Sequence, residues 1–379
     1  MSDNRGYPDY RFLRTLEREP GSLPDEERLR AINGPLLTWY SEHARDLPWR
    51  KDRQAYHIWI SEIMLQQTRV EAVKPYYRRF MEAFPDAAAL AAAEDETLLK
   101  LWEGLGYYSR ARNLKKAAVE ICEKYGGELP ASWKELLALP GIGSYTAGAI
   151  ASIAFGIPAP AVDGNVLRVL SRFLGSRRDV SQASTKKYFE EILTKTMDRE
   201  EPGLFNQGLF EVGALVCVPK GAPRCEDCPL SWLCRARMEG LWEEIPVKAS
   251  KKPRRVEERT ILVITNGSQV AIRKRPDKGL LASLYEFPGV EERLALENEK
   301  DWKKAASAVG VAESDVESVK PLGEAKHIFS HVEWHMTGYH ISIKCPIPQP
   351  YVSADIRELE TRYPVPSAFE AYRKAFSEK

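Results

Sequence analysis

The chain has 379 residues, enough for roughly two or three domains that each bury a core of their own. Its content of 44% hydrophobic and 29% charged residues excludes a disordered or membrane-embedded protein, and no apolar run approaches the length of a membrane span. The formal net charge is only +1, so composition alone does not indicate a nucleic-acid binder. Because the first residues contain no apolar signal sequence, we expect a cytoplasmic protein.

Residues 1–28 mix charge with proline and glycine and are predicted to form an N-terminal extension. Apolar residues at helical spacing then predict a series of helices, and no strand is expected before about residue 256. The first two thirds of the chain are therefore predicted to be all-α. The predicted helices cover residues 29–42, 56–68, 70–83, 87–102, 111–124, 133–138 and 144–155.

One predicted helix, YHIWISEIMLQQT, carries an acidic residue on a largely apolar face. Glu62 lies one turn after Ile58 and Trp59 and one turn before Leu65. Burial there would raise the pKa of the carboxyl and keep it protonated near neutral pH, as a general acid requires. From this helix alone, a glutamate on the polar edge, paired with Arg69 or with water, is the more common arrangement.

Residues 139–155, LPGIGSYTAGAIASIAF, combine a glycine turn with a helix of small residues. Gly141 and Gly143 flank Ile142, so the turn can adopt positive φ and expose backbone N–H groups that suit a phosphate. The small side chains of the helix permit a neighbouring helix to approach closely.

Asp163 stands just before an apolar-periodic run that begins at Val166, where a helix N-cap is expected. The capping N–H groups and the helix dipole both favour the ionised carboxylate. Taken alone, this stretch is equally typical of an ordinary hairpin followed by a capped helix.

Basic residues gather in three places although the net charge is small. They lie in SRARNLKK (109–116), at arginines 168, 172, 177 and 178, and in VKASKKPRR (247–255). Tyr107 and Tyr108 precede the first cluster, and aromatics beside cations suit stacking on bases. Each cluster is nevertheless more often a solvated face than a DNA footprint.

Four of the six cysteines form the pattern C-x7-C-x2-C-x5-C: Cys217, Cys225, Cys228 and Cys234. Thiols in a reducing compartment rarely pair as disulfides, so the cluster indicates a metal site. Four thiolates hold either a tetrahedral zinc or an iron–sulfur cluster, and the spacing favours iron–sulfur only slightly.

After a basic linker at residues 246–258 the pattern changes. RTILVIT, the turn NGS and QVAIRKR predict a β-hairpin, and HVEWHMTGYHISIKC also alternates. A helix is expected over 301–308. Residues 259–379 are therefore predicted to form a separate α+β domain.

In this combination the chain resembles adenine DNA glycosylases of the MutY type, within the helix-hairpin-helix superfamily that includes endonuclease III. The resemblance covers roughly residues 29–375. It is carried by LPWR (47–50), SEIMLQQT (61–68), WEGLGYYSRARNL (102–114), LPGIGSYTAGAI (139–150), VDGNV (162–166), the cysteine loop and FSH (329–331). It implies a multidomain protein, with an all-α helix-hairpin-helix catalytic region at 29–245 that includes a four-cysteine iron–sulfur loop at 217–234, followed by the α+β Nudix-like domain at 259–379.

The resemblance also implies roles for individual residues. Glu62 would protonate adenine at N7 while the N-glycosidic bond breaks, and Asp163 would stabilise the oxocarbenium-like sugar. Tyr145 and Asn165 would arrange that aspartate and the attacking water. Relatives that also cut the DNA backbone have a lysine at position 145, so a monofunctional glycosylase is expected here.

Further implied contacts concern the DNA. Gln67 and Tyr107 would occupy the gap left by the flipped adenine and its neighbouring stack, and Gly141, Ile142 and Gly143 would bind a phosphate beside the lesion. The expected partner is double-stranded DNA with an A:8-oxoguanine or A:G mismatch, bound by a monomeric bacterial enzyme with no membrane partner.

The C-terminal domain resembles the Nudix-like domain of the same family. RKRPDKGLLASLYEFPGV approaches a Nudix metal box, but VEERLALENEKDW after Gly289 lacks the carboxylate spacing that holds magnesium. Lesion recognition without hydrolysis is therefore expected, with Phe329, Ser330 and His331 reading 8-oxoguanine.

The resemblance assigns a [4Fe-4S] cluster to the four cysteines, although the family pattern has six residues between the first two and this chain has seven. Two alternatives remain at this point. An endonuclease III-like glycosylase and lyase is disfavoured by Tyr145 and by the additional domain. A zinc-dependent DNA-binding module without catalytic activity would need neither Glu62 nor Asp163.

Overall fold

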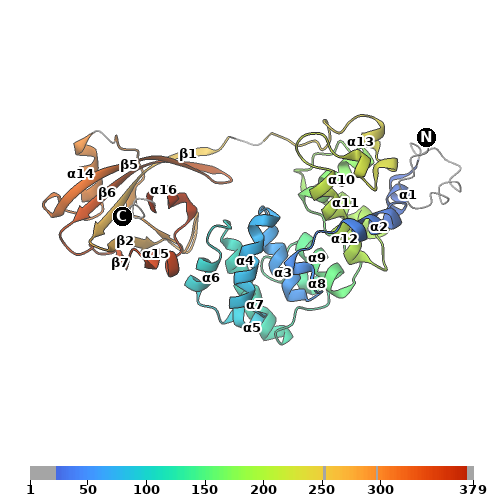
Figure 1. Cartoon of the computed structure of the whole chain (residues 1–379), viewed down its shortest axis with the longest axis horizontal. Coiled ribbons are helices and arrows are strands. Elements are labelled where there is room, and N and C mark those ends of the chain that lie inside the picture. Colours follow the sequence, from blue (N-terminus) through green and yellow to red (C-terminus); the bar gives the residue numbers. More distant parts are fainter. Residues whose placement is uncertain (1–22, 251–252, 296–297, 374–379) are drawn as a thin grey trace. The chain divides into compact units, whose positions relative to one another are not determined.

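The computed structural model describes residues 23–250, 253–295 and 298–373. Contacts within the chain divide it into two compact units, whose elements are labelled in Figure 1. Unit 1 comprises Met1–Ala91 and Lys116–Ser250, and unit 2 comprises Ala92–Lys115 and Lys251–Lys379. Most of the predicted N-terminal extension, residues 1–22, lies outside the described residues, as do residues 251–252 of the basic linker.

Unit 1 is helical throughout its described part. Helix α7, Ser109–Tyr125, begins in unit 2 and ends in unit 1. Short 3₁₀ turns lie at Pro48–Arg50, Cys225–Asp227 and Ser231–Leu233, and a π-helical turn lies at Val212–Val216. The remaining helices are α1 (Asp25–Arg30), α2 (Asn33–His43), α3 (Ala55–Leu65), α4 (Val70–Ala83), α5 (Ala87–Ala91), α8 (Trp133–Ala138), α9 (Ser144–Phe155), α10 (Gly164–Leu174), α11 (Ala183–Thr196), α12 (Pro202–Glu211) and α13 (Arg235–Met238).

Three helices, α4, α8 and α9, have the bounds that the sequence predicts, and two predicted helices are divided. The helix expected at 29–42 is broken after Arg30, because Pro35 has no N–H to donate and fits only in the first turn of the new helix α2. The helix expected at 87–102 breaks before Asp95, where acidic residues favour a helix N-terminus. The helix that carries Glu62 ends at Leu65 rather than at residue 68.

The small residues of α9 permit the close packing that the sequence predicts. A Cβ at Gly148 would lie 2.1 Å from the carbonyl oxygen of Pro160, in the segment that leads to Asp163. On the neighbouring helix α12, a Cβ at Gly203 would lie 2.8 Å from the carbonyl oxygen of Ser152 in α9. Real side chains do not fit at such distances, so both glycines hold the helices around the site at close range.

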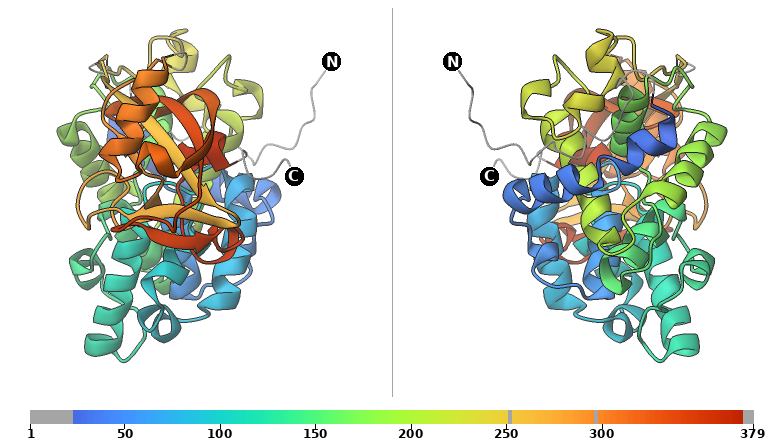
Figure 2. Two further views of the ribbon diagram at one scale, coloured as in Figure 1. Left: turned by 90° about the vertical axis from the view of Figure 1, so that its left-hand side faces the viewer. Right: turned by 90° about the vertical axis from the view of Figure 1, so that its right-hand side faces the viewer.

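Unit 2 contains one mixed sheet, which the strands coloured yellow to red show in Figure 1 and Figure 2. Its strand order is β3-β2-β1-β6-β5, with β4 also paired to β1 and β7 to β2. The predicted hairpin is confirmed as β1 and β2, while β1 runs parallel to β6. The elements are α6 (Asp95–Leu101), β1 (Arg255–Asn266), β2 (Gln269–Lys274), β3 (Tyr285–Glu286), β4 (Gly289–Val290), α14 (Glu299–Ala308), a 3₁₀ turn (Glu313–Asp315), β5 (Val316–Ile328), β6 (Val332–Ile343), β7 (Val352–Asp355), α15 (Glu358–Thr361), a 3₁₀ turn (Ser367–Phe369) and α16 (Glu370–Arg373).

Alternate residues of the central strand point to opposite faces of this sheet, as a period of two requires. Leu262 and Ile264 of β1 join a core that includes the alanines of α14. Ile261 and Val263 join a second core that includes Phe369 and Tyr372. The sheet is therefore covered on both faces, which confirms the predicted α+β domain.

Within the described residues, no helix combines the length and the apolar composition that a bilayer crossing would require.

Candidate active site

A cavity of about 150 Å³ in unit 1 brings together all four residues for which the sequence implies chemistry. Glu62 comes from α3, Tyr145 from the first turn of α9, and Asp163 and Asn165 from the start of α10. Three helices thus converge on one small cavity. Apolar side chains complete its wall, including Ile58 from the helix that carries Glu62.

Glu62 is buried, with an exposed fraction of only 6%. Burial raises the pKa of its carboxyl to about 7, because the charged form loses its hydration, and nearby Asp163 acts in the same direction. The Tyr145 hydroxyl donates a hydrogen bond to Glu62 Oε2, and this bond and the charge of Arg50 oppose the rise. The polar-edge arrangement is therefore wrong, and Glu62 lies where its proton is held near neutral pH.

Asp163 caps α10, as the sequence predicts. Its Oδ1 accepts hydrogen bonds from the backbone N–H groups of Asn165, at 2.9 Å, and Val166, at 2.8 Å. The side-chain amide of Asn165 donates to Oδ2 at 2.9 Å. Burial nevertheless raises the pKa of Asp163 above its ordinary value, so desolvation outweighs the hydrogen bonds that favour the charge. The cap alone predicted the opposite direction.

Tyr145 contacts a different carboxyl from the one expected. The family resemblance implied that Tyr145 and Asn165 both arrange Asp163. The Tyr145 hydroxyl instead donates to Glu62, and only the Asn165 side chain donates to Asp163. Each carboxyl of the pair therefore has one side-chain donor of its own. This separation lets the two groups keep different protonation states in one cavity.

A chain of hydrogen bonds leads from Asp163 towards the cysteine loop. Arg168 Nη2 donates to Asn165 Oδ1 at 3.0 Å, and Arg168 Nε donates to the carbonyl oxygen of Cys217 at 2.8 Å. Arg168 and Arg172 are 7% and 6% exposed. The interpretation of this basic cluster as a solvated face is therefore wrong for these two arginines, because a helical spacing of four residues turns both toward the interior.

Sequence reasoning missed a third carboxylate, close to the cavity. Glu211, at the end of α12, is fully buried and accepts from Arg45 Nε at 2.8 Å and also from Arg50. Both arginines and Gln207 line the cavity. Arg50 is part of the LPWR motif, so the motif itself was the available signal, whereas Glu211 shows only ordinary helical spacing.

The four clustered cysteines line one small cavity of about 30 Å³ in the loop that follows α12. None of them forms a disulfide. Arg172 Nη1 lies 3.4 Å from Cys217 Sγ, in position to donate to the sulfur. The four cysteines thus share one cavity with a cationic donor beside them, although the described residues contain no group of three or more ligand side chains arranged to hold a metal ion.

The glycine hairpin and the turn after α3 present backbone at the surface of unit 1. Gly141 has φ 76°, as expected, and Gly143 is the N-cap of α9. Ile142 is buried and its N–H donates to the carbonyl oxygen of Leu139 at 3.2 Å, so the exposed backbone of the hairpin is that of Gly141 and Gly143. Gln67 is exposed and has φ 59°, which is uncommon for a residue other than glycine and is typical of functional turns.

In unit 2, Tyr107 also has a positive φ, 47°, and is 46% exposed. Its hydroxyl lies 3.1 Å from Ser330 Oγ, in the turn between β5 and β6. The two residues that the family resemblance assigned to DNA and to the lesion are thus neighbours. His331 is exposed, whereas Phe329 packs against Trp334 with ring centroids 4.8 Å apart and fixes the turn.

Comparisons with known proteins identify the family of the chain. The family model for HhH-GPD superfamily base excision DNA repair proteins matches residues 60–196, and the NUDIX domain model matches residues 260–375. The chain is 34% identical to an adenine DNA glycosylase of Homo sapiens in an alignment 415 residues long. The alignment covers 93% of this chain and 74% of the relative. The chain belongs to the adenine DNA glycosylase family. It is accordingly a DNA glycosylase of base excision repair.

This adenine DNA glycosylase family member is also similar to a bacterial relative and to a solved structure. An adenine DNA glycosylase of Buchnera aphidicola subsp. Schizaphis graminum is 35% identical over 305 residues, covering 79% of this chain and 84% of the relative. The structure of a thermostable thymine-DNA glycosylase is 30% identical with a TM-score of 0.50, and covers 56% of this chain and 98% of that chain.

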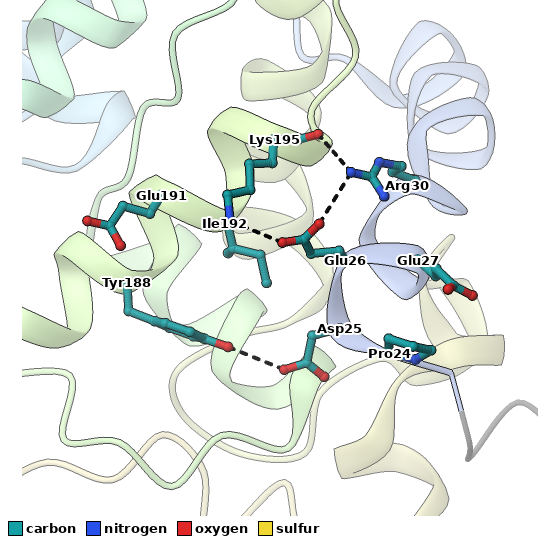
Figure 3. A pocket seen from close by; sticks show the side chains of 9 residues that line it. All are labelled: Pro24, Asp25, Glu26, Glu27, Arg30, Tyr188, Glu191, Ile192 and Lys195. Atoms are coloured by element: carbon teal, nitrogen blue, oxygen red, sulfur yellow. Dashed lines mark hydrogen bonds and ion pairs between the residues drawn. The ribbon is translucent and has the colours of Figure 1, made fainter.

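A larger pocket in this family member, about 550 Å³, lies away from these residues between α1 and α11 (Figure 3). Its charged groups bind one another: Glu26 accepts from Arg30 at 3.3 Å and from Lys195 at 3.2 Å, while Tyr188 donates to Asp25 at 3.3 Å. These bonds tie α1 to α11. The smaller cavity, which holds both Glu62 and Asp163, is therefore the candidate active site.

Proposed function

We propose that this enzyme hydrolyses the N-glycosidic bond of adenine that is mispaired with 8-oxoguanine or guanine in duplex DNA. It would act as a monomer in the bacterial cytoplasm, where unpaired cysteines such as its six persist. The observation that carries this function is the pair Glu62 and Asp163 in one cavity, one carboxyl with a pKa near neutrality and the other held by an N-cap.

In the proposed reaction the adenine leaves the duplex and enters the cavity, which is easiest for a mispaired base. Glu62 donates its proton to N7, so the bond between N9 and the sugar breaks with its electron pair left on a neutral base. Asp163 stabilises the positive charge that develops on the sugar. One water molecule then adds to the anomeric carbon and gives a proton to the Glu62 carboxylate, which restores the acid. The products are free adenine and an abasic site.

The rate of excision should fall as pH rises through about 7. Glu62 acts in its protonated form, and its pKa is raised to about 7. The protonated fraction, and with it the single-turnover rate, should be about tenfold lower at pH 8 than at pH 6. Single-turnover excision between these values measures this, and a rate that rises over the same interval would contradict the acid role.

We also propose that the enzyme does not cut the DNA backbone. None of the residues that line the cavity is a lysine, and position 145 is a tyrosine that already donates to Glu62. The direct test of both proposals uses duplex DNA with A opposite 8-oxoguanine. Adenine should be released, strand breaks should appear only after alkali, and borohydride should trap almost no protein–DNA adduct. An absence of adenine release would refute the proposed activity, and efficient trapping would refute the monofunctional mechanism.

A [4Fe-4S] cluster bound by Cys217, Cys225, Cys228 and Cys234 is part of the proposal. The shared cavity of the four sulfurs and the Arg172 donor support it. When bound, the cluster would fix the loop after α12, to which Arg168 is hydrogen-bonded through the Cys217 carbonyl. A brown protein that absorbs visible light is expected after anaerobic purification, whereas a colourless protein with bound zinc would contradict it.

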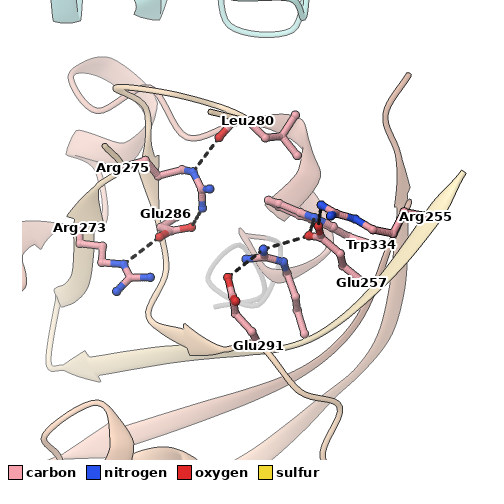
Figure 4. Close-up of polar contacts among 9 residues, drawn as sticks. Arg255, Glu257, Arg273, Arg275, Leu280, Glu286, Glu291 and Trp334 are labelled. Carbon is pink, nitrogen blue, oxygen red and sulfur yellow. Dashed lines mark hydrogen bonds and ion pairs between the residues drawn. The ribbon is translucent and has the colours of Figure 1, made fainter. Parts of the chain in front are cut away.

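We propose that unit 2 recognises the opposite base and hydrolyses nothing. In Figure 4, Glu286 lies between two arginines and accepts from Arg273 Nε at 2.8 Å and from Arg275. A carboxylate neutralised in this way is a poor magnesium ligand. Ser330 and His331, exposed in a turn fixed by Phe329, would instead read 8-oxoguanine.

A further inference from the structure

Residues 92–115 belong to unit 2 together with the β-sheet, although this segment lies within the part of the chain that the helix-hairpin-helix family model matches. The contact between the segment and the sheet domain is built from charges. Glu103 Oε1 lies 2.5 Å from Arg373 Nη1, and Glu103 Oε2 lies 2.7 Å from Lys100 Nζ. The three side chains are between 16% and 19% exposed, so solvent screens them only in part.

Both cations also bind the backbone of the sheet domain. Lys100 Nζ donates to the carbonyl oxygen of Leu359 at 2.7 Å, and Arg373 Nη2 donates to the same oxygen at 3.2 Å. Glu103 therefore neutralises two cations that share one carbonyl acceptor. We call this group of Lys100, Glu103 and Arg373 the charged anchor.

Two more polar contacts fix the segment on either side. Before the anchor, the Tyr285 hydroxyl donates to Glu96 Oε1 at 2.7 Å, and this bond lowers the pKa of Glu96. After it, Arg112 Nη1 donates to the carbonyl oxygen of Ala282 at 2.8 Å. The loop between Glu103 and Arg112 is thus held to the sheet domain at both of its ends.

That loop contains Tyr107, whose hydroxyl lies 3.1 Å from Ser330 Oγ. The loop is stiff as well as anchored, because Arg110 donates to the carbonyl oxygens of Leu105, at 2.8 Å, and Gly106, at 3.0 Å. A rigid segment fixed at both ends holds one particular distance between Tyr107 and the recognition turn. Sites that discriminate by hydrogen bonds depend on such placement to within a fraction of an ångström.

We propose that the charged anchor determines specificity: Lys100, Glu103 and Arg373 are positioning residues that hold the Tyr107 loop against the Ser330 turn, so that the base opposite adenine is read by both together. This inference rests on the proposed function, since it concerns the preference for 8-oxoguanine over guanine. It assigns discrimination to contacts that touch neither the DNA nor the cavity with Glu62.

The test is the ratio of single-turnover excision rates on A:8-oxoguanine and A:G duplexes. Arg373→Ala and the isosteric Glu103→Gln should each reduce this ratio by about 2- to 30-fold, the range found for residues that couple two sites. The double variant should reduce the ratio little more than either single variant does, because both substitutions break the same ion pair between Glu103 and Arg373. Arg373→Lys keeps the charge and should restore most of the ratio.

Two reference variants calibrate the result. Arg293→Ala breaks an ion pair with Glu324 inside the sheet domain, away from the segment, and should leave the ratio unchanged. Ser330→Ala combined with His331→Ala removes the recognition side chains and sets the size of the full effect. If this double change lowers the ratio and the anchor variants do not, the anchor proposal is wrong while the proposed function stands. If the parent enzyme itself shows no preference, the anchor proposal and the proposed reading of the opposite base both fail, whereas adenine excision is refuted only by an absence of adenine release.

Discussion

Replacing Glu62 with glutamine should reduce single-turnover excision of adenine by about 10²–10⁴-fold, the usual contribution of a positioned general acid. Glutamine has nearly the same shape and can still accept the hydrogen bond from Tyr145, but it has no proton to donate at neutral pH. Binding to the mismatched duplex should change little, because Glu62 is buried in the cavity and carries no net charge when protonated. Excision rates and duplex affinity, measured on the same preparation, separate the two effects.

Stability provides the control for this variant. The pKa of Glu62 is raised from 4.5 in a model peptide to about 7 in the folded protein, so the folded state binds this proton more tightly than the unfolded state. The folded state is therefore destabilised as pH rises from 4.5 to 7, by about 3 kcal/mol for a shift of this size. Glu62→Gln removes that penalty and should be at least as stable as the parent at pH 8. Glu71→Gln, the same change at an exposed residue of α4, should alter neither rate nor stability. If the excision rate of Glu62→Gln is within tenfold of the parent rate, Glu62 is not the general acid of the reaction.

The parts of the site that sequence could predict are those with a local signal. Asp163 stands before an apolar-periodic run, so a cap followed from neighbours within a few positions. The apolar neighbours of Glu62 allowed a buried acid, but that helix alone favoured a glutamate on its polar edge. The glycine hairpin is equally local, and α8 and α9 have their predicted bounds. Local signals also define the hairpin of β1 and β2, because the alternation of β1 and the turn after it lie within one stretch.

The parts that sequence could not predict depend on residues far apart in the chain. Glu211 bonds to Arg45 from 166 positions away, and Glu103 pairs with Arg373 from 270 positions away. No periodicity links such residues, and each charge alone is more typical of a solvated surface. Arg168 was misinterpreted for the same reason, since its acceptor on Cys217 lies 49 positions further on. The roles of these residues follow only once the fold brings them together.

The second large effect is expected from Asp163, where charge and structure can be separated. Asp163→Asn keeps a side-chain oxygen that can accept from the backbone N–H groups of Asn165 and Val166, and asparagine is as good an N-cap as aspartate. The fold should therefore survive with little change in the free energy of unfolding. The negative charge opposite the developing sugar cation is lost, and removal of one such electrostatic partner usually slows a reaction by about 10²–10³-fold.

Asp163→Ala is the matched comparison, because it removes the charge and the cap together. Its excision rate should be reduced about as much as that of Asp163→Asn, but it should also lose about 0.5–2 kcal/mol of stability, the usual cost of a missing N-cap. Single-turnover rates and thermal unfolding of both variants distinguish the two contributions. If Asp163→Asn keeps the parent rate while Asp163→Ala does not, the residue serves α10 alone, and the stabilisation of the sugar must come from another group in the cavity.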